Sequence, residues 1–213
     1  DLIPHQLRVA ELAAERRQPR LLLADEVGLG KTIEAAMITA QQLATGRSKR
    51  VLILTPESLT HQWFVELLRR FNLRFALYDE ERCEAITEVD TTANPFEDEQ
   101  CVIAAVDWLA RDKKRAAQLL EAGWDLLVVD EAHHLAWTPD APSREYSLVE
   151  ALATQTAGVI LLTATPEQLG RSGHFARLRL LDPARYDNLE HFTAESDRHL
   201  ALSSITDALL EGH

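Results

Sequence analysis

The sequence predicts an α/β domain with a mainly parallel sheet that is covered by helices on both faces. Short apolar runs alternate along the 213-residue chain with longer stretches in which apolar residues recur at helical spacing. The apolar runs are continuous, without alternating polar positions. Continuous runs are typical of parallel strands, because the crossover helices between such strands bury both faces of the sheet.

The apolar runs place the strands along the chain. Strands are expected at residues 21–24, 51–54, 74–78, 101–105, 126–129 and 159–162. Right-handed crossovers would bring the carboxyl ends of the first, fifth and sixth of these strands to one edge of the sheet. Ligands bind at that edge in open α/β sheets, so the active-site crevice is expected there.

Helices are expected in the stretches between and around the strands. They lie at residues 3–17, with Pro4 in the first turn, at 33–45, which Gly46 ends, at 58–71, at 146–155, and after 166, with a break at Asp182-Pro183. In the helix that precedes Gly46, five residues at helical spacing are expected to form the buried face: Ile33, Ala36, Met37, Ala40 and Leu43.

Two polar stretches separate the middle strands. Residues 79–100 are acidic and poor in apolar residues, with Asn94-Pro95 as a turn signal, so a solvated excursion is expected. Residues 111–115 are the one compact basic run, with Arg111, Lys113, Lys114 and Arg115. A solvated face is favoured there over a nucleic-acid patch.

The composition is that of a soluble globular domain, with 46% hydrophobic and 26% charged residues. No apolar run approaches the roughly 18–20 residues of a membrane span, so no membrane partner is expected. The chain begins at Asp1 without an initiator methionine or a signal segment, which indicates a piece of a longer protein. With a net charge of −12, any nucleic-acid contact is expected to be local or to lie in a part of the protein outside this sequence.

Cysteine and histidine spacing does not favour a metal centre. Cys83 and Cys101 form no C-x-x-C pair, which argues against a zinc site and is compatible with a reducing cytosol. His133 and His134 are adjacent, so on a strand or a helix they are expected to point in different directions.

A phosphate-binding loop is predicted after the first strand. The segment reads Asp25-Glu26-Val27-Gly28-Leu29-Gly30-Lys31-Thr32. Backbone N–H groups of such a loop and of the following helix point at an anion, while Lys31 would reach the β- and γ-phosphates and the Thr32 hydroxyl would bind Mg²⁺. The full P-loop motif has glycine where this chain has Asp25. A dinucleotide-binding fingerprint would need a third glycine where the chain has Ile33. A second site is therefore needed to confirm that the loop binds phosphate.

That second site follows the apolar run at residues 126–129. Asp130 would hold the Mg²⁺ shell, and Glu131 would orient or deprotonate the attacking water. Alone, this pattern fits an ordinary strand that ends in a solvated acidic turn. Together with Lys31 and with Thr163-Ala164-Thr165 at the end of the last strand, it predicts an ATP site that uses Mg²⁺.

These segments resemble the Swi2/Snf2-type ATPases of helicase superfamily 2. Residues 25–32 are similar to motif I of that family, in which aspartate is usual at the first position. Thr55-Pro56 with Gln62-Trp63 resembles motif Ia, the Asp-Glu-Ala-His sequence at 130–133 (a DEAH box) resembles motif II, and residues 163–165 resemble motif III. Longer stretches, such as residues 69–77 and 174–183, resemble a bacterial, RNA polymerase-associated branch of the family.

The resemblance implies a fold and a set of roles. The fold is a RecA-like P-loop NTPase lobe, with residues 1–187 as the ATP-binding lobe and 188–213 as its helical extension. Gln6 would recognise adenine, and His133, Thr163 and Thr165 would link the nucleotide state to nucleic acid. Thr55, Pro56 and Gln62, near the end of the second strand, are candidate nucleic-acid contacts.

The expected function is that of the first lobe of a double-stranded DNA translocase that remodels or recycles RNA polymerase complexes. The resemblance implies a second lobe with arginines that complete the site, so the chain alone is expected to hydrolyse ATP poorly and to bind DNA weakly. Its expected location is the bacterial cytoplasm, at the nucleoid. Two alternatives stay open: a docking module with a vestigial nucleotide site, and the motor lobe of another superfamily 2 helicase.

Overall fold

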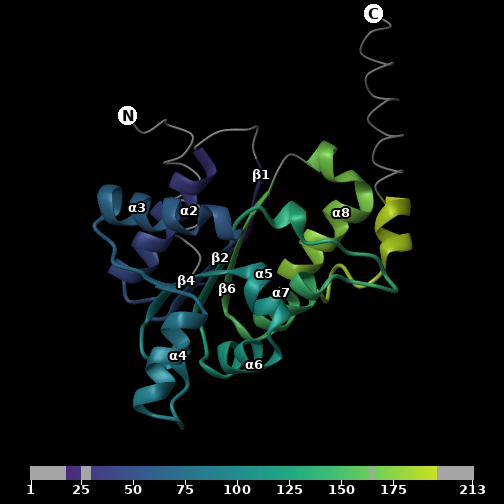
Figure 1. Ribbon diagram of the computed structural model, residues 1–213. Coiled ribbons are helices and arrows are strands. Elements are labelled where there is room, and N and C mark those ends of the chain that lie inside the picture. Colours follow the sequence, from purple (N-terminus) through teal and green to yellow (C-terminus); the bar gives the residue numbers. More distant parts are fainter. Residues whose placement is uncertain (1–17, 25–29, 164–165, 196–213) are drawn as a thin grey trace, which may run out of the picture.

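The structure is a computed structural model, and it describes residues 18–24, 30–163 and 166–195. Six strands form one sheet in the order β1-β6-β5-β2-β4-β3, and every pairing is parallel (Figure 1). The strands are β1 Arg20–Ala24, β2 Val51–Thr55, β3 Ala76–Tyr78, β4 Cys101–Ala105, β5 Leu126–Val129 and β6 Gly158–Thr163. The predicted strands are therefore confirmed, although β3 begins two residues later than expected.

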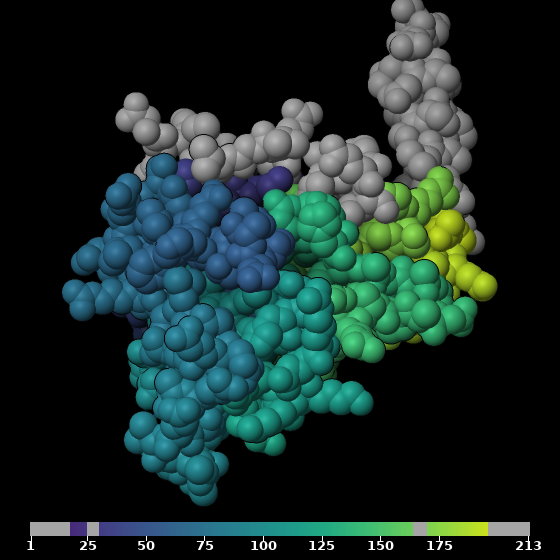
Figure 2. Space-filling view, viewed as in Figure 1, coloured from purple at the N-terminus to yellow at the C-terminus, as the bar shows by residue number. Residues whose placement is uncertain are grey.

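Helices cover both faces of the sheet. One face carries α2 (Gly30–Ala44) and α3 (Thr60–Phe71). The other face carries α4 (Glu80–Val89), α5 (Val106–Arg111), α6 (Lys113–Glu121), α7 (Arg144–Gln155) and α8 (Pro166–Leu181). Three short 3-10 turns complete the elements: η1 (Glu57–Leu59), η2 (Pro95–Glu97) and η3 (Ala132–His134). In the space-filling view, α3 in blue and α8 in green lie on opposite sides of the molecule (Figure 2).

Two hydrophobic clusters, one on each face of the sheet, form the core. Successive strand residues point to opposite faces, so Leu52 and Leu54 join the cluster under α5–α8, while Val51 and Ile53 join the cluster under α2 and α3. All five residues of β2 are buried. Burial on both faces explains why the strands read as continuous apolar runs, as predicted.

The buried face of α2 differs from the prediction. Of the five apolar residues expected there, only Ala36 is buried, and the helix instead buries Glu34, Ala35, Ile38, Thr39 and Gln42. Apolar residues occupy much of the circumference of this helix, so their pattern does not locate its centre. The predicted end is confirmed, because Gly46 has a left-handed φ of 68° just after the helix.

Residues 79–100 do not form the solvated excursion that was expected. Asp79 caps α4 by accepting a hydrogen bond from the Arg82 backbone N–H at 2.9 Å. Phe96 is fully buried and stacks on Tyr78 with ring centroids 5.4 Å apart. A helix cap and a few buried residues thus anchor a segment whose average composition is polar.

The basic run at residues 111–115 is split by the fold. Lys113 and Lys114 are exposed, but the Arg115 side chain is only 3% exposed and pairs with Glu80. The Arg115 guanidinium donates hydrogen bonds to both carboxylate oxygens of Glu80. Arg115 therefore joins α6 to α4 and cannot belong to a solvated basic face.

The Glu80→Gln substitution is expected to destabilise the fold at neutral pH by about 1–2 kcal/mol, a value reduced by the partial exposure of Glu80. The hydrogen bond from Arg115 holds the pKa of Glu80 below its ordinary value. Stability from the ionised group is therefore complete above the unfolded pKa, near 4.3, and is lost as pH falls through the lower folded pKa.

Urea denaturation of wild type and variant at pH 7 and at decreasing acidic pH measures this effect. The stability difference should shrink as the solution becomes acidic. The control is Glu81→Gln, an exposed position on the same helix, which should cost little at any pH. A Glu80→Gln cost that does not depend on pH would contradict the proposed role of the ion pair.

No helix among the described residues is long and apolar enough to cross a membrane.

Candidate active site

Three strand ends that carry predicted site residues meet at one edge of the sheet. Ala24 at the end of β1 pairs with Thr163 at the end of β6, and Val129 at the end of β5 pairs with Leu161 of the same strand β6. Because the strands are parallel, their carboxyl ends and the segments that follow lie together. The expected convergence of the first, fifth and sixth strands is confirmed.

Gly30, Lys31 and Thr32 form the first turn of α2, close to the end of β1. The first N–H groups of a helix lack partners within the helix, and its dipole favours an anion there. No acidic residue occupies this turn to compete with such an anion. The preceding residues of the predicted loop, Asp25, Glu26, Val27, Gly28 and Leu29, lie outside the described residues, as do Gln6 and Thr165.

Asp130 follows β5 and is only 9% exposed. Its Oδ2 accepts a hydrogen bond from Trp63 Nε1 at 2.7 Å, and its Oδ1 accepts one from the Glu131 backbone N–H at 2.8 Å. Burial raises the pKa of Asp130, while these hydrogen bonds and the positive charge of Lys31 oppose the rise. A nearby cation would favour the charged carboxylate, so this buried position suits a bound divalent ion.

The donor set around Lys31 fits a hard divalent cation. The Asp130 carboxylate and the Thr32 hydroxyl offer oxygen ligands, which Mg²⁺ prefers. The positive charge of Lys31, at the start of α2, also favours the ionised form of the Asp130 carboxylate at the end of β5. These residues could hold a magnesium-bound phosphate, with the cation near the carboxylate and the anion at the helix terminus.

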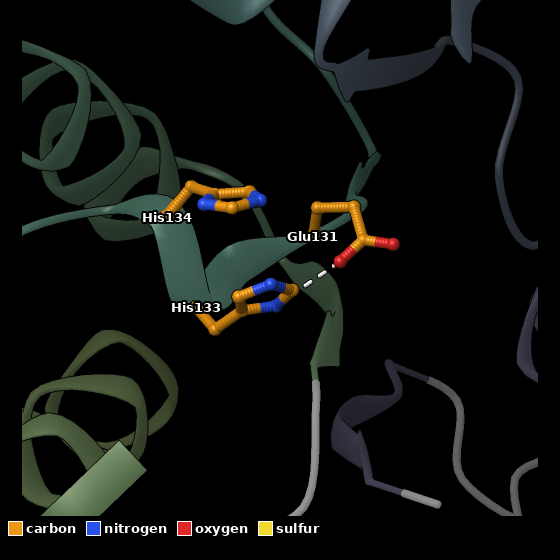
Figure 3. Close-up of side chains that lie close together, drawn as sticks. All are labelled: Glu131, His133 and His134. Atoms are coloured by element: carbon orange, nitrogen blue, oxygen red, sulfur yellow. Dashed lines mark ion pairs between the residues drawn. The ribbon is translucent and has the colours of Figure 1, made fainter. Parts of the chain in front are cut away.

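Glu131 occupies a left-handed backbone conformation, with φ 50° and ψ 40°. This region costs a residue with a side chain roughly 1–2 kcal/mol and is common where strain serves a site. The conformation turns the chain from β5 into η3. Glu131 Oε2 lies 3.1 Å from His133 Nδ1 (Figure 3). Burial is the main cause that lowers the pKa of His133.

The two adjacent histidines do not point apart, so that prediction was wrong. The ring centroids of His133 and His134 are 4.1 Å apart, and Figure 3 shows both rings beside Glu131 on one side of the turn. They lie in a single short turn at the sheet edge. There, side-chain torsions set the ring directions, and no regular repeat extends far enough to separate them.

The remaining predicted residues differ in accessibility. Thr163 is buried, and its hydroxyl has no hydrogen-bond partner among the described residues. Thr55 is fully buried, so its side chain offers no surface to a nucleic acid in this structure, whereas Pro56 is half-buried and Gln62 is exposed. Only the last two therefore have side-chain surface for such a contact.

Sequence reasoning missed two residues that support the acidic turn. Trp63 was predicted to pack in the core, and this is confirmed, because its side chain is only 1% exposed. Its indole N–H also donates a hydrogen bond to Asp130, which was not predicted. Arg177 of α8 is 2% exposed and donates to the backbone oxygens of Ala132 at 2.9 Å and Leu135 at 2.6 Å. A buried tryptophan usually needs a partner for its N–H, which is a usable signal, whereas nothing local marks Arg177.

We expect Trp63→Phe to lower stability by about 1–2 kcal/mol and to weaken binding of a magnesium nucleotide about three- to tenfold. The aromatic packing is kept, but Asp130 loses a hydrogen bond that orients its carboxylate. Chemical denaturation and calorimetric titration measure the two effects. Trp124→Phe is the matched control, because Trp124 Nε1 also donates a buried hydrogen bond, to the Leu119 oxygen, at a distance from Asp130 in the fold. Equal effects on nucleotide binding would contradict an orienting role for Trp63.

Comparison with known proteins identifies the family. The model of the SNF2-related domain matches residues 5–209. The chain belongs to this SNF2-related domain family. The RNA polymerase-associated protein RapA of Vibrio cholerae serotype O1 is 58% identical over 212 residues, and that of Yersinia enterocolitica serotype O:8 is 59% identical over the same length. Each match covers 99% of this chain but only 22% of the relative, so the chain spans about a fifth of their length.

Solved structures agree with the SNF2-related assignment at the level of the fold. The Sulfolobus solfataricus SWI2/SNF2 ATPase core in complex with dsDNA superposes with a TM-score of 0.72 at 24% identity, covering 91% of this chain and 38% of that one. The core domain from the same organism gives a TM-score of 0.70 at 23% identity. The predicted RecA-like α/β lobe is thereby confirmed.

Proposed function

We propose that this chain is the ATP-binding first lobe of a Swi2/Snf2-type DNA translocase that remodels or recycles RNA polymerase complexes. The observation that carries the proposal is the convergence of the carboxyl ends of β1, β5 and β6 at one edge of the sheet, where the buried Asp130 follows β5 and Lys31 lies in the first turn of α2. The RapA relatives support the polymerase partner, and the dsDNA-bound structural neighbour supports the DNA partner.

In this proposal the edge of the sheet holds MgATP. Residues 25–30 cradle the phosphates with their backbone N–H groups, and Gln6 recognises the adenine. Lys31 binds the β- and γ-phosphates, while Thr32 and Asp130 hold the cation. Mg²⁺, when bound, neutralises negative charge on the phosphates. Trp63 keeps the Asp130 carboxylate turned toward the site through its indole N–H.

Glu131 is proposed to orient the attacking water and to accept its proton. Its backbone is left-handed, and its carboxylate lies 3.1 Å from His133 Nδ1. His133, Thr163 and Thr165 are proposed to couple the nucleotide to nucleic acid. The buried Thr163 hydroxyl, without a partner among the described residues, supports a role that needs a further contact.

The lobe is proposed to be catalytically incomplete by itself. Family resemblance implies a second lobe with arginines that stabilise the transferring phosphoryl group, an effect worth about 10³–10⁵ in rate. We therefore expect this chain to bind ATP and to hydrolyse it poorly. Residues 1–187 would form the lobe and 188–213 its helical extension. The protein would be located in the bacterial cytoplasm, and this lobe alone would bind dsDNA weakly.

The test is a calorimetric titration of the chain with Mg²⁺–ATPγS. Lys31→Ala should weaken binding at least about tenfold, or roughly 1.4 kcal/mol. Lys114→Ala, an exposed lysine on α6, is the control and should leave the affinity unchanged. Binding by wild type that is indifferent to Lys31 would contradict the proposed phosphate site. Absence of binding, repeated in a chain with both lobes, would favour a docking module with a vestigial site.

A further inference from the structure

Three potential metal ligands lie in one turn after β5. Glu131, His133 and His134 each offer one ligand atom, and these atoms all lie within 4.8 Å of one another. Among the described residues, no other group of three histidine, cysteine or acidic side chains comes together in this way. Figure 3 shows the two imidazole rings and the carboxylate gathered on the same side of the turn.

The chemistry of these ligands differs from that of the proposed Mg²⁺ site. Two imidazole nitrogens and one carboxylate oxygen are a ligand set typical of Zn²⁺, with a fourth position open to water, whereas Mg²⁺ prefers oxygen alone. Tetrahedral coordination at about 2.0–2.1 Å places ligand atoms about 3.3 Å apart. Glu131 Oε2 and His133 Nδ1 are already 3.1 Å apart.

The third ligand can reach the same point. His134 is exposed, and the Glu131 side chain is 37% exposed, so small rotations about their side-chain bonds meet little packing resistance.

An open route leads to the turn. A cavity of about 680 Å³ is lined by Glu131 and His134 and also by the carboxylates of Glu57, Asp107 and Glu145. The negative charge of these groups favours a divalent cation in the cavity.

We propose that Glu131, His133 and His134 form a binding site for a borderline divalent transition metal, with Zn²⁺ as the representative ion. The Glu131 carboxylate would then be coordinated to the metal. If Glu131 activates the attacking water, the bound metal inhibits ATP hydrolysis. This consequence rests on the proposed function. The binding itself does not depend on that function.

Metal binding is tested on this chain without nucleotide. Co²⁺ is titrated and followed by its visible absorption, and Zn²⁺ is then used to displace it. His134→Ala should weaken the Zn²⁺ affinity at least tenfold and reduce the Co²⁺ absorption bands. His61→Ala, an exposed histidine on α3, and Cys101→Ser, a half-buried thiol, should leave both unchanged.

Circular dichroism establishes that each variant is folded, which the exposure of His134 favours. Equal Zn²⁺ affinity in wild type and His134→Ala overturns the proposal, as does a loss that appears only in Cys101→Ser. Because no nucleotide is present, failure of the ATP site does not affect this outcome.

The inhibitory consequence is tested on the full-length protein. Zn²⁺ at micromolar concentration should reduce ATP turnover of wild type, and His134→Ala should keep its basal turnover and raise the inhibitory concentration at least tenfold. Identical inhibition of both proteins would overturn the link between this site and hydrolysis.

Discussion

Glu131→Gln is expected to reduce ATP turnover about 10²–10⁴-fold in a protein that carries both lobes, with nucleotide affinity nearly unchanged. Glutamine has the size of glutamate but cannot accept a proton. The substitution also leaves intact the Asp130 carboxylate and its hydrogen bonds to Trp63 and to the backbone N–H of residue 131. Turnover is therefore affected far more than binding.

Phosphate release at saturating MgATP and a calorimetric titration with Mg²⁺–ATPγS measure the two quantities. Glu145→Gln is the matched control, because Glu145 lines the same cavity as Glu131 but lies on α7. It should change turnover less than about twofold. Turnover of Glu131→Gln near that of wild type would rule out a general-base role for this carboxylate.

Arg177→Met is expected to lower stability by about 2–4 kcal/mol and also to weaken nucleotide binding. Arg177 binds the backbone oxygens of Ala132 and Leu135, which bracket the turn after Glu131. Methionine fills similar space but leaves both oxygens without this donor. The cost is limited because burial also penalises the charge, as the lowered pKa of Arg177 indicates.

Arg20→Met provides the control that separates stability from function. Arg20, on β1, likewise donates only to backbone oxygens in the contacts described, those of Ala153, Thr156, Leu180 and Leu181 at the ends of α7 and α8. Its loss should cost comparable stability, measured by urea denaturation. It should not alter nucleotide affinity when both variants are titrated well below their unfolding transitions. If Arg177→Met binds nucleotide as wild type does, the contact serves stability alone.

The sheet and the position of the site along the chain could be predicted from local sequence patterns. Each buried strand needs a continuous apolar run, and the runs at β2, β4, β5 and β6 are unambiguous because both of their faces are covered. Parallel connection then places strand ends at one edge, so the convergence of Lys31, Asp130 and Thr163 followed from local pattern and chain order. These properties depend on neighbours in sequence and on general rules of chain connection.

Which side chains meet could not be predicted in the same way, because it depends on long-range packing. Trp63 and Asp130 are 67 residues apart, Arg177 and Ala132 are 45 apart, and Arg115 and Glu80 are 35 apart. Each contact depends on how a helix is rotated and shifted on the sheet, and the same uncertainty made the predicted face of α2 wrong. The grouping of Glu131, His133 and His134 could not be predicted either, because it depends on the left-handed backbone of Glu131 and on side-chain torsions in a short turn. Sequence periodicity indicates which side of a helix or strand is apolar. The rotation of each helix about its axis and its long-range side-chain contacts are set by packing of the whole domain.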